Sequence, residues 1–403
     1  MNAHLCHDAT AIMRVHPVLP KRSLDSTALH RAGASLNTEA DAERLNVVER
    51  TGLAFLRRGC RRDDSEIRPW QDEDRARIRR LQIWAIGLCG LAGAVSAALI
   101  GAADLWLRNV LGTGSDPSLL SPGSDVAYWA WYGGIALLLS LLELLAMYWV
   151  LLRSVAGIAD AAGLSVSQGD ADDVLTTGLS RAALDIPNPR RSLHGLDPYA
   201  RTSRLKLLAY TALYRIKVGA TSFIVRILAR RVLARSGLRV LLPFAAVPVF
   251  AGWNALIAWW VIREARVRAA GPLAVREAVA ALERAQLDDA SRRLALDAVA
   301  ELVVAAEDAH PNYDLLLARL CGALDIEARI PEWTEVRARL ARADAPTQRA
   351  VLALMTTTTA LRGRSSRSQR RVLESAYIAC DRPLGDALRA ARRHIAEGRC
   401  ASA

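Results

Sequence analysis

The sequence predicts an all-α integral membrane protein with a soluble helical domain at its C-terminal end. Residues 83–103 and 126–152 are long apolar runs; the first holds no charge and the second only Glu143. A third uncharged run covers residues 240–262. From residue 272 onward, alanine, leucine and arginine recur at helical spacing, with breaks at prolines. These runs predict a two-helix transmembrane hairpin, a basic hydrophobic helical hairpin and then the soluble helices.

Composition supports a membrane partner. The 403 residues are 52% apolar and 23% charged, with a net charge of +12. A basic balance suits nucleic acid or an anionic membrane surface. Because the arginines flank the apolar runs, we expect the lipid bilayer and anionic lipid headgroups as partners, and no nucleic acid. Six cysteines without a CxxC pair predict reduced thiols.

Five segments follow from these changes in composition. The boundaries are residues 1–75 for a disordered cytoplasmic tail, 76–153 for the transmembrane hairpin with spans at about 83–105 and 127–152, 154–204 for a polar linker, 205–271 for basic and hydrophobic membrane-associated helices, and 272–403 for the soluble helical domain.

Arginine distribution predicts the orientation. Residues 57–80 hold nine arginines, whereas the loop at residues 104–125 holds only Arg108. The positive-inside bias places the N-terminus in the cytoplasm and this loop outside. Abundant alanine, and arginine in place of lysine, are typical of a GC-rich bacterial genome. We therefore predict a multi-pass protein of the bacterial cytoplasmic (inner) membrane, with a cytoplasmic C-terminal domain.

The run at residues 240–262 is long enough to cross a bilayer, but Pro243 and Pro248 remove helical hydrogen bonds in its first half. A single crossing would also place strongly basic flanks on both sides of the membrane. We expect a re-entrant segment, or one packed as a hairpin with the preceding basic helices. A proline-kinked transmembrane helix is the alternative.

Residues 238–268 resemble the closing motif of EcsC-type bacterial proteins, with Pro243, Gly252 and Asn254 at the matching positions. The resemblance implies membrane association and no enzyme chemistry.

Two intramembrane polar residues are candidate functional positions, Glu143 and Asn254. We expect Glu143 to be protonated or hydrogen-bonded to Ser140 or Ser96. In an alternative function, Glu143 and Asn254 line a polar path in a transporter or channel.

Small residues recur every four positions in the first span, at Gly93, Ala97 and Gly101. Such a stripe lets helices approach closely in lipid. We expect it to pack against the other helix of the hairpin, with a homo-oligomer as the alternative.

The C-terminal block contains two similar helix–turn–helix units and resembles the tellurite-resistance TerB-like fold. That family has Asp-Gly-x-x-Ser-x-x-Glu at the turn, and its acids can bind a divalent metal. Here the turn has Arg362, Gly363, Ser366 and Gln369, so both carboxylates are replaced. We therefore expect a scaffold with no metal or other cofactor, its glycine forming the turn and its serine an N-cap.

The first turn keeps three acids, Glu307, Asp308 and Asp314, which are the only candidate metal ligands. Other residues of the block are expected to be structural. The threonines at 356–359 should bond back to the preceding helical turn in a tight helix–helix contact, and His310 should be a solvated helix-end residue.

No phosphate-binding glycine loop, GxSxG elbow or HExxH motif occurs. An enzyme acting on a lipid or phosphate ester would need a nucleophile and a base, and neither is evident. The sequence favours a non-enzymatic, membrane-anchored interaction or regulatory module with a protein partner. A subunit or accessory component of a membrane transporter or channel is the alternative.

Overall fold

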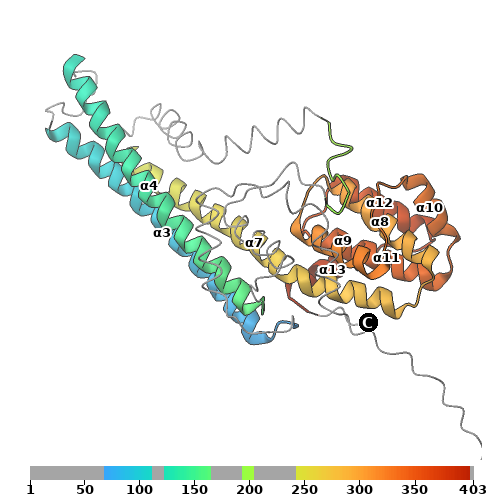
Figure 1. Ribbon diagram of the computed structural model, residues 1–403. Helices are drawn as coiled ribbons and strands as arrows, with labels where there is room; N and C mark the ends of the chain where they lie inside the picture. Colours follow the sequence, from blue (N-terminus) through green and yellow to red (C-terminus); the bar gives the residue numbers. More distant parts are fainter. Residues whose placement is uncertain (1–67, 111–121, 165–192, 204–241, 400–403) are drawn as a thin grey trace, which may run out of the picture. The chain divides into compact units, whose positions relative to one another are not determined.

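The computed structural model describes residues 68–110, 122–164, 193–203 and 242–399 (Figure 1). These residues are all-helical, apart from an isolated bridge between Leu193 and Leu196. The helices are α3 (Asp72–Val110), α4 (Pro122–Ala161), α7 (Leu242–Arg284), α8 (Asp289–Ala306), α9 (Pro311–Leu324), α10 (Trp333–Arg342), α11 (Ala345–Ala360), α12 (Arg367–Ala379) and α13 (Ala387–Ala396). Almost all of the predicted tail, and residues 205–241 of the basic and hydrophobic helices predicted at 205–271, lie outside the described residues.

Helices α3 and α4 form the predicted antiparallel hairpin. Arg77 pairs with Asp160 at one end of it, at 2.8 Å. At the other end the Tyr128 hydroxyl donates to Asp104. Both helices are long and apolar enough to cross a membrane, by length and composition alone. Both helices continue beyond the predicted spans, and the extension of α4 buries Val155, Ile158 and Ala159.

The outer surface of this hairpin is strongly apolar. Trp84 is 67% exposed and Leu137 is 72% exposed. Further exposed apolar side chains on the two helices include Ile83, Leu91, Leu99, Trp106, Trp129, Trp131, Leu138, Leu141, Leu144 and Trp149. The polar side chains Ser96 and Glu143 are buried instead. This distribution is the reverse of that in a water-soluble helix pair, whose apolar stripe faces inward.

Helix α7 packs along α3 in the antiparallel direction and also contacts α4 (Figure 1). It is helical from Leu242 to Arg284, with Pro248 and Pro272 inside it. The sequence predicted interrupted helical bonding in its first half. Pro243 lies in the first turn, where no intrahelical partner is lost, and only one bond is removed at Pro248. The predicted domain boundary between residues 271 and 272 falls within this helix.

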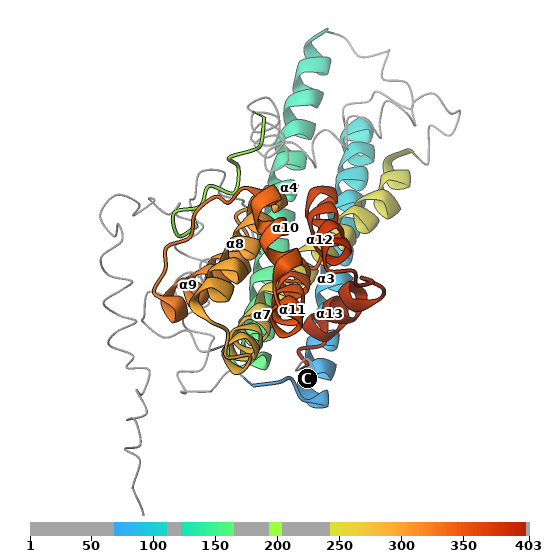
Figure 2. The same ribbon diagram turned by 90° about the vertical axis from the view of Figure 1, so that its right-hand side faces the viewer.

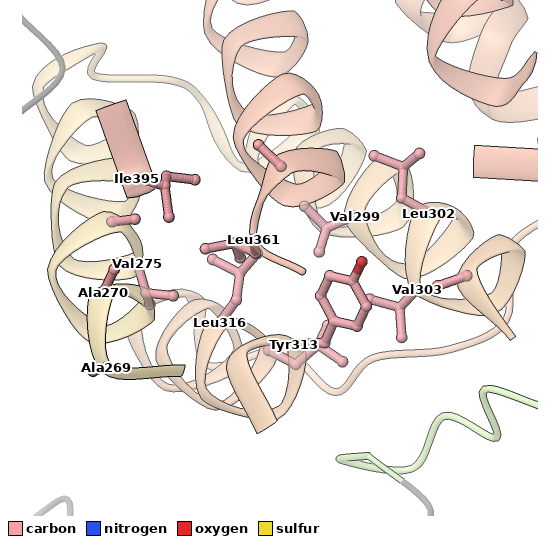
Figure 3. Packing of buried hydrophobic residues seen from close by; sticks show 14 of the residues in the cluster. Ala269, Ala270, Val275, Val299, Leu302, Val303, Tyr313, Leu316, Leu361 and Ile395 are labelled. Atoms are coloured by element: carbon pink, nitrogen blue, oxygen red, sulfur yellow. The ribbon is translucent and has the colours of Figure 1, made fainter. Parts of the chain in front are cut away.

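The C-terminal helices pack around the second half of α7 (Figure 2). Their core includes Val299, Leu316 and Leu361, none of which is exposed. The Tyr313 ring lies among apolar side chains of α8, and α7 contributes Ala270 and Val275 to the same cluster (Figure 3). The domain core is therefore built partly from the helix that also packs on α3.

Segment 193–203, predicted as part of a polar linker, is packed against this domain. Leu193 and Leu196 are fully buried. Arg201 donates to Glu301 of α8 at 2.5 Å and to the Pro331 carbonyl at 3.2 Å. A linker prediction missed these contacts because they depend on partners 100 or more residues away in the sequence.

Most predicted helix breaks in the domain are confirmed. Pro311 begins α9, and Pro346 lies in the first turn of α11. The hydroxyls of Thr356, Thr358 and Thr359 each donate to the carbonyl four residues earlier, at 2.8–2.9 Å. All three threonines are buried, as a tight helix contact requires.

Candidate functional site

The two polar residues singled out from the apolar runs meet inside the helix bundle. Glu143 of α4 and Asn254 of α7 are 7% and 2% exposed. The Asn254 Nδ2 donates to the Glu143 Oε1 at 2.7 Å. The hydroxyl of Ser140, an expected partner of Glu143, donates to the Ala136 carbonyl at 2.5 Å. The amide–carboxyl pair therefore ties α4 to α7.

Gly93 of α3 lies against the same pair. A Cβ added at Gly93 would come within 2.5 Å of the Asn254 Nδ2 and 2.7 Å of the Phe250 carbonyl oxygen. A Cβ at Gly90 would also face α7, 3.3 Å from the Ala251 carbonyl oxygen. The small stripe was expected to pack against α4, but this part of it faces α7. Gly93 provides the room that the Asn254 side chain occupies.

A second polar site stabilises α7 where it enters the C-terminal domain. Pro272 has no backbone N–H, so it cannot donate to the Arg268 carbonyl four residues earlier. Asn312, which is fully buried, donates from Nδ2 to the Val267 carbonyl at 3.0 Å and the Leu361 carbonyl at 2.9 Å. A Cβ at Gly271 would overlap the Asn312 amide. Gly271, Pro272 and Asn312 form a fitted joint between α7, α9 and the end of α11, here called the Asn312 joint.

His310 lies next to this joint and is 3% exposed, so the expectation of a solvated histidine was wrong. Its Nδ1 accepts from the Asn312 backbone N–H at 3.2 Å, which leaves Nε2 to donate to the Glu264 Oε1 at 3.1 Å. Arg268 donates to the same oxygen at 2.9 Å. Burial acts to raise the pKa of Glu264, but the hydrogen bond from His310, together with Arg268, outweighs it and holds that pKa well below its usual range.

The three candidate metal ligands have separate structural partners. Glu307 is the left-handed C-cap residue of α8, with φ 51°. Asp308 pairs with Arg362 at 2.6 Å, and Asp314 lies 3.4 Å from the His194 Nε2. Within the described residues, no group of three or more His, Cys, Asp or Glu side chains could hold a metal ion. Arg362 of the second turn therefore neutralises Asp308 of the first.

The rest of the turn forms as its glycine and serine predicted. Gly363 has φ +73°, and Ser366 caps α12 in a reciprocal capping box with Gln369. The buried Gln369 amide also donates to the Leu302 carbonyl at 3.1 Å and the Tyr313 hydroxyl at 2.9 Å. Burial is the main influence that raises the pKa of Tyr313 to about 12. The Gln369 amide therefore makes neutral structural hydrogen bonds.

Comparisons with protein-family models, with curated proteins and with solved structures found no match to this chain.

Sequence reasoning missed two groups of buried acids. Asp104 is 3% exposed and binds Tyr128 and Arg108 at the loop end of the hairpin. Asp297 and Glu301, one turn apart on α8, are each 1% exposed.

Arginines hold these two α8 acids. Asp297 accepts hydrogen bonds from Arg293 at 3.0 Å and from Arg339 at 2.6 Å. Glu301 accepts one from Arg201. The sequence signal for these buried acids was their position inside the apolar stretch at residues 294–304. Carboxylates buried there need charged partners, which predicts arginines nearby.

Proposed function

We propose that the protein is a membrane-anchored regulatory or interaction module, in which a helical bundle in the bilayer is coupled to a cytoplasmic helical domain that meets a protein partner. The observation that carries this proposal is the continuity of α7. One helix packs on α3 in its first half and contributes Ala270 and Val275 to the domain core in its second. A tilt or shift of α7 in the bundle would therefore reach the domain without a flexible linker.

Support for a bilayer environment comes from the outward apolar surface of α3 and α4. Exposed tryptophans occur towards both ends of the apolar region, with Trp106, Trp129 and Trp131 near the loop end and Trp84 and Trp149 near the other. Indole rings favour the headgroup level. The buried Glu143–Asn254 pair is also expected in lipid, where polar side chains face other helices.

The geometry favours a third crossing at residues 242–262 over a re-entrant segment. Arg266 bonds Gln82 near the start of the α3 span, and Asn254 lies beside Gly93 farther along it. The N-terminal end of α7 therefore points towards the loop end of the hairpin. At 1.5 Å per residue these 21 residues would extend about 31 Å, close to the hydrocarbon thickness.

The membrane part of the proposal can be tested by cysteine labelling in whole cells. In a cysteine-free background, Ser124→Cys and Phe244→Cys should react with a membrane-impermeant maleimide from outside. Glu374→Cys on α12 should react only after the cells are opened. Labelling of Phe244→Cys only in opened cells would overturn the third crossing, and recovery of the protein in the alkaline-carbonate supernatant would overturn membrane anchoring altogether.

The regulatory part requires a partner that responds to α7. A photoreactive residue at exposed positions of α12 should capture a specific protein in intact cells. Asn254→Leu, which disconnects α7 from α4, should change the yield of that product, whereas Gly322→Ala in α9, with open space beside it, should not. Equal yields in both variants would refute coupling through α7.

The Glu143–Asn254 pair also favours the second candidate, a transporter or channel component. Full-length protein in liposomes containing a pH-sensitive dye distinguishes the two. The regulatory module predicts the same proton leak as protein-free liposomes. A flux that Glu143→Gln abolishes would replace the module with a transport function.

A further inference from the structure

Arginines from four parts of the chain gather where the apolar half of α7 ends. They are Arg79 of α3, Arg263 and Arg266 of α7, Arg364 before α12 and Arg392 of α13, here called the arginine cluster. Arg266 donates to the Gln82 side chain at 2.9 Å and the Ala396 carbonyl at 3.1 Å, so α3, α7 and α13 meet here.

Two further contacts bring the loop before α12 to the same place. Arg392 donates to the Ser365 hydroxyl at 2.5 Å. A Cβ at Gly363 would lie 3.0 Å from the Val267 Cγ2 of α7. Arg364, between these two contacts, is exposed.

The charges of the cluster act on one another. Burial, followed by the charge of Arg79, lowers the pKa of Arg266. Burial and then Arg364 lower the pKa of Arg263. Burial and neighbouring arginines, Arg263 among them, lower the pKa of Arg392. The positive charges are thus close enough to oppose each other's protonation.

Carboxylates compensate these charges only in part: the charge of Glu264 acts to raise the pKa of Arg263, but burial and Arg364 outweigh it. Among the residues that the structure describes, none of the five arginines is in an ion pair, and the Nε of Arg392 is buried without a hydrogen-bond partner. The nearby Glu264 is engaged by Arg268 and His310. In contrast, the buried acids Asp297 and Glu301 deeper in the domain each have arginine partners. Excess positive charge on packed elements favours an anion from outside the chain.

The cluster lies at the level expected for lipid headgroups. The Arg263 guanidinium stacks over the Trp259 ring, 5.5 Å from its centroid. On α4 the Arg153 guanidinium stacks over Trp149 in the same way, at 5.4 Å. An arginine one turn beyond a tryptophan marks the step from hydrocarbon to headgroup.

We propose that the arginine cluster is a binding site for the phosphate of an anionic phospholipid headgroup. This inference rests on the proposed membrane function. Guanidinium groups bind phosphate oxygens in paired hydrogen bonds, and the adjoining apolar surface of α7 and α3 suits acyl chains. A lipid held there bridges the membrane helices to α13 and the loop before α12, and so fixes the domain against the bundle.

The test uses full-length protein in mild detergent, with thermal unfolding and native mass spectrometry as readouts. Phosphatidylglycerol should raise the unfolding midpoint and remain bound, whereas phosphatidylcholine should do neither. The test variant is Arg263→Gln/Arg364→Gln, because neither side chain makes a hydrogen bond within the described residues and the fold should persist. Two charges, each contributing about fivefold, predict about a 25-fold loss of lipid affinity.

The control is Arg337→Gln/Arg342→Gln on α10, which removes the same charge from two exposed positions. It should bind the lipid like the wild type. Equal affinity in test and control variants, or no preference for the anionic lipid, would overturn the site. If inorganic phosphate stabilises the protein as much as the lipid does, the arginine cluster binds a soluble anion, and the proposal of a lipid ligand is refuted.

Failure of the site is distinguishable from failure of the proposed function. Protein that inserts into neutral bilayers and resists carbonate extraction, but shows no lipid preference, refutes only the site. Protein that does not insert refutes the membrane function on which the site rests.

Discussion

Substitution of Gly271 by alanine is the sharpest test of the Asn312 joint, because two principles predict opposite signs. Alanine in place of glycine inside a helix stabilises it by about 1 kcal/mol. In this structure, however, the new Cβ would overlap the Asn312 amide and displace it from between α7 and α9.

Displacement would break the bonds from Asn312 to the Val267 and Leu361 carbonyls. Two hydrogen bonds at about 1 kcal/mol each, plus about 1 kcal/mol for leaving buried polar groups unpaired, give a loss of about 3 kcal/mol. After the helix gain, Gly271→Ala should destabilise the protein by about 2 kcal/mol. For a domain of this size, that corresponds to a fall of about 6 °C in the unfolding midpoint.

The assay is thermal unfolding of the full chain in mild detergent, with circular dichroism as the signal. Gly322→Ala is the matched control, because a Cβ there meets nothing within 4 Å. It should raise the midpoint slightly. In an Asn312→Ala background, Gly271→Ala should no longer destabilise, because the clash is gone. A higher midpoint for Gly271→Ala in the wild-type background would refute the joint.

Three further predictions follow from the same contacts. Asn254→Leu should remove the bond to Glu143 and cost about 0.6–2 kcal/mol, measured as a lower unfolding midpoint in detergent; an unchanged midpoint would contradict the pair. Glu264 has a depressed pKa, so its stabilising contribution is present above about pH 4.3 and is lost as the pH falls further. The wild-type midpoint should therefore fall more steeply than that of Glu264→Gln below that pH, and parallel curves would refute the His310 contact. Ser366→Ala removes an N-cap and a bond to the Ala305 carbonyl, and should cost about 1–2 kcal/mol by the same assay; wild-type stability would show that the cap is dispensable.

Local features were predictable from the sequence because their causes are local. The apolar runs gave α3 and α4, and prolines marked the starts of α9 and α11. Gly363 and Ser366 indicated a turn and a cap, which a left-handed φ and a capping box confirm. Each depends on residues within a few positions of one another, where backbone sterics and short-range hydrogen bonds decide.

Pairings between distant residues could not be predicted in this way. Glu143 and Asn254 were each recognisable as polar residues in apolar runs. No feature of the neighbouring sequence indicated that the Asn254 Nδ2 lies 2.7 Å from the Glu143 Oε1. His310 gave no sign of burial, since its partner Glu264 lies 46 residues away.

The sequence by itself determined that the chain forms apolar and amphipathic helices, because hydropathy and periodicity are properties of each segment. Only the tertiary structure decided that α7 packs on α3 through Gly93 and enters the C-terminal core through the Asn312 joint. Those choices depend on shape and hydrogen-bond complementarity between helices far apart in the chain. The Asn254 side chain fits between the helices because Gly93 has no side chain there. The sequence around either residue does not indicate that the two lie together.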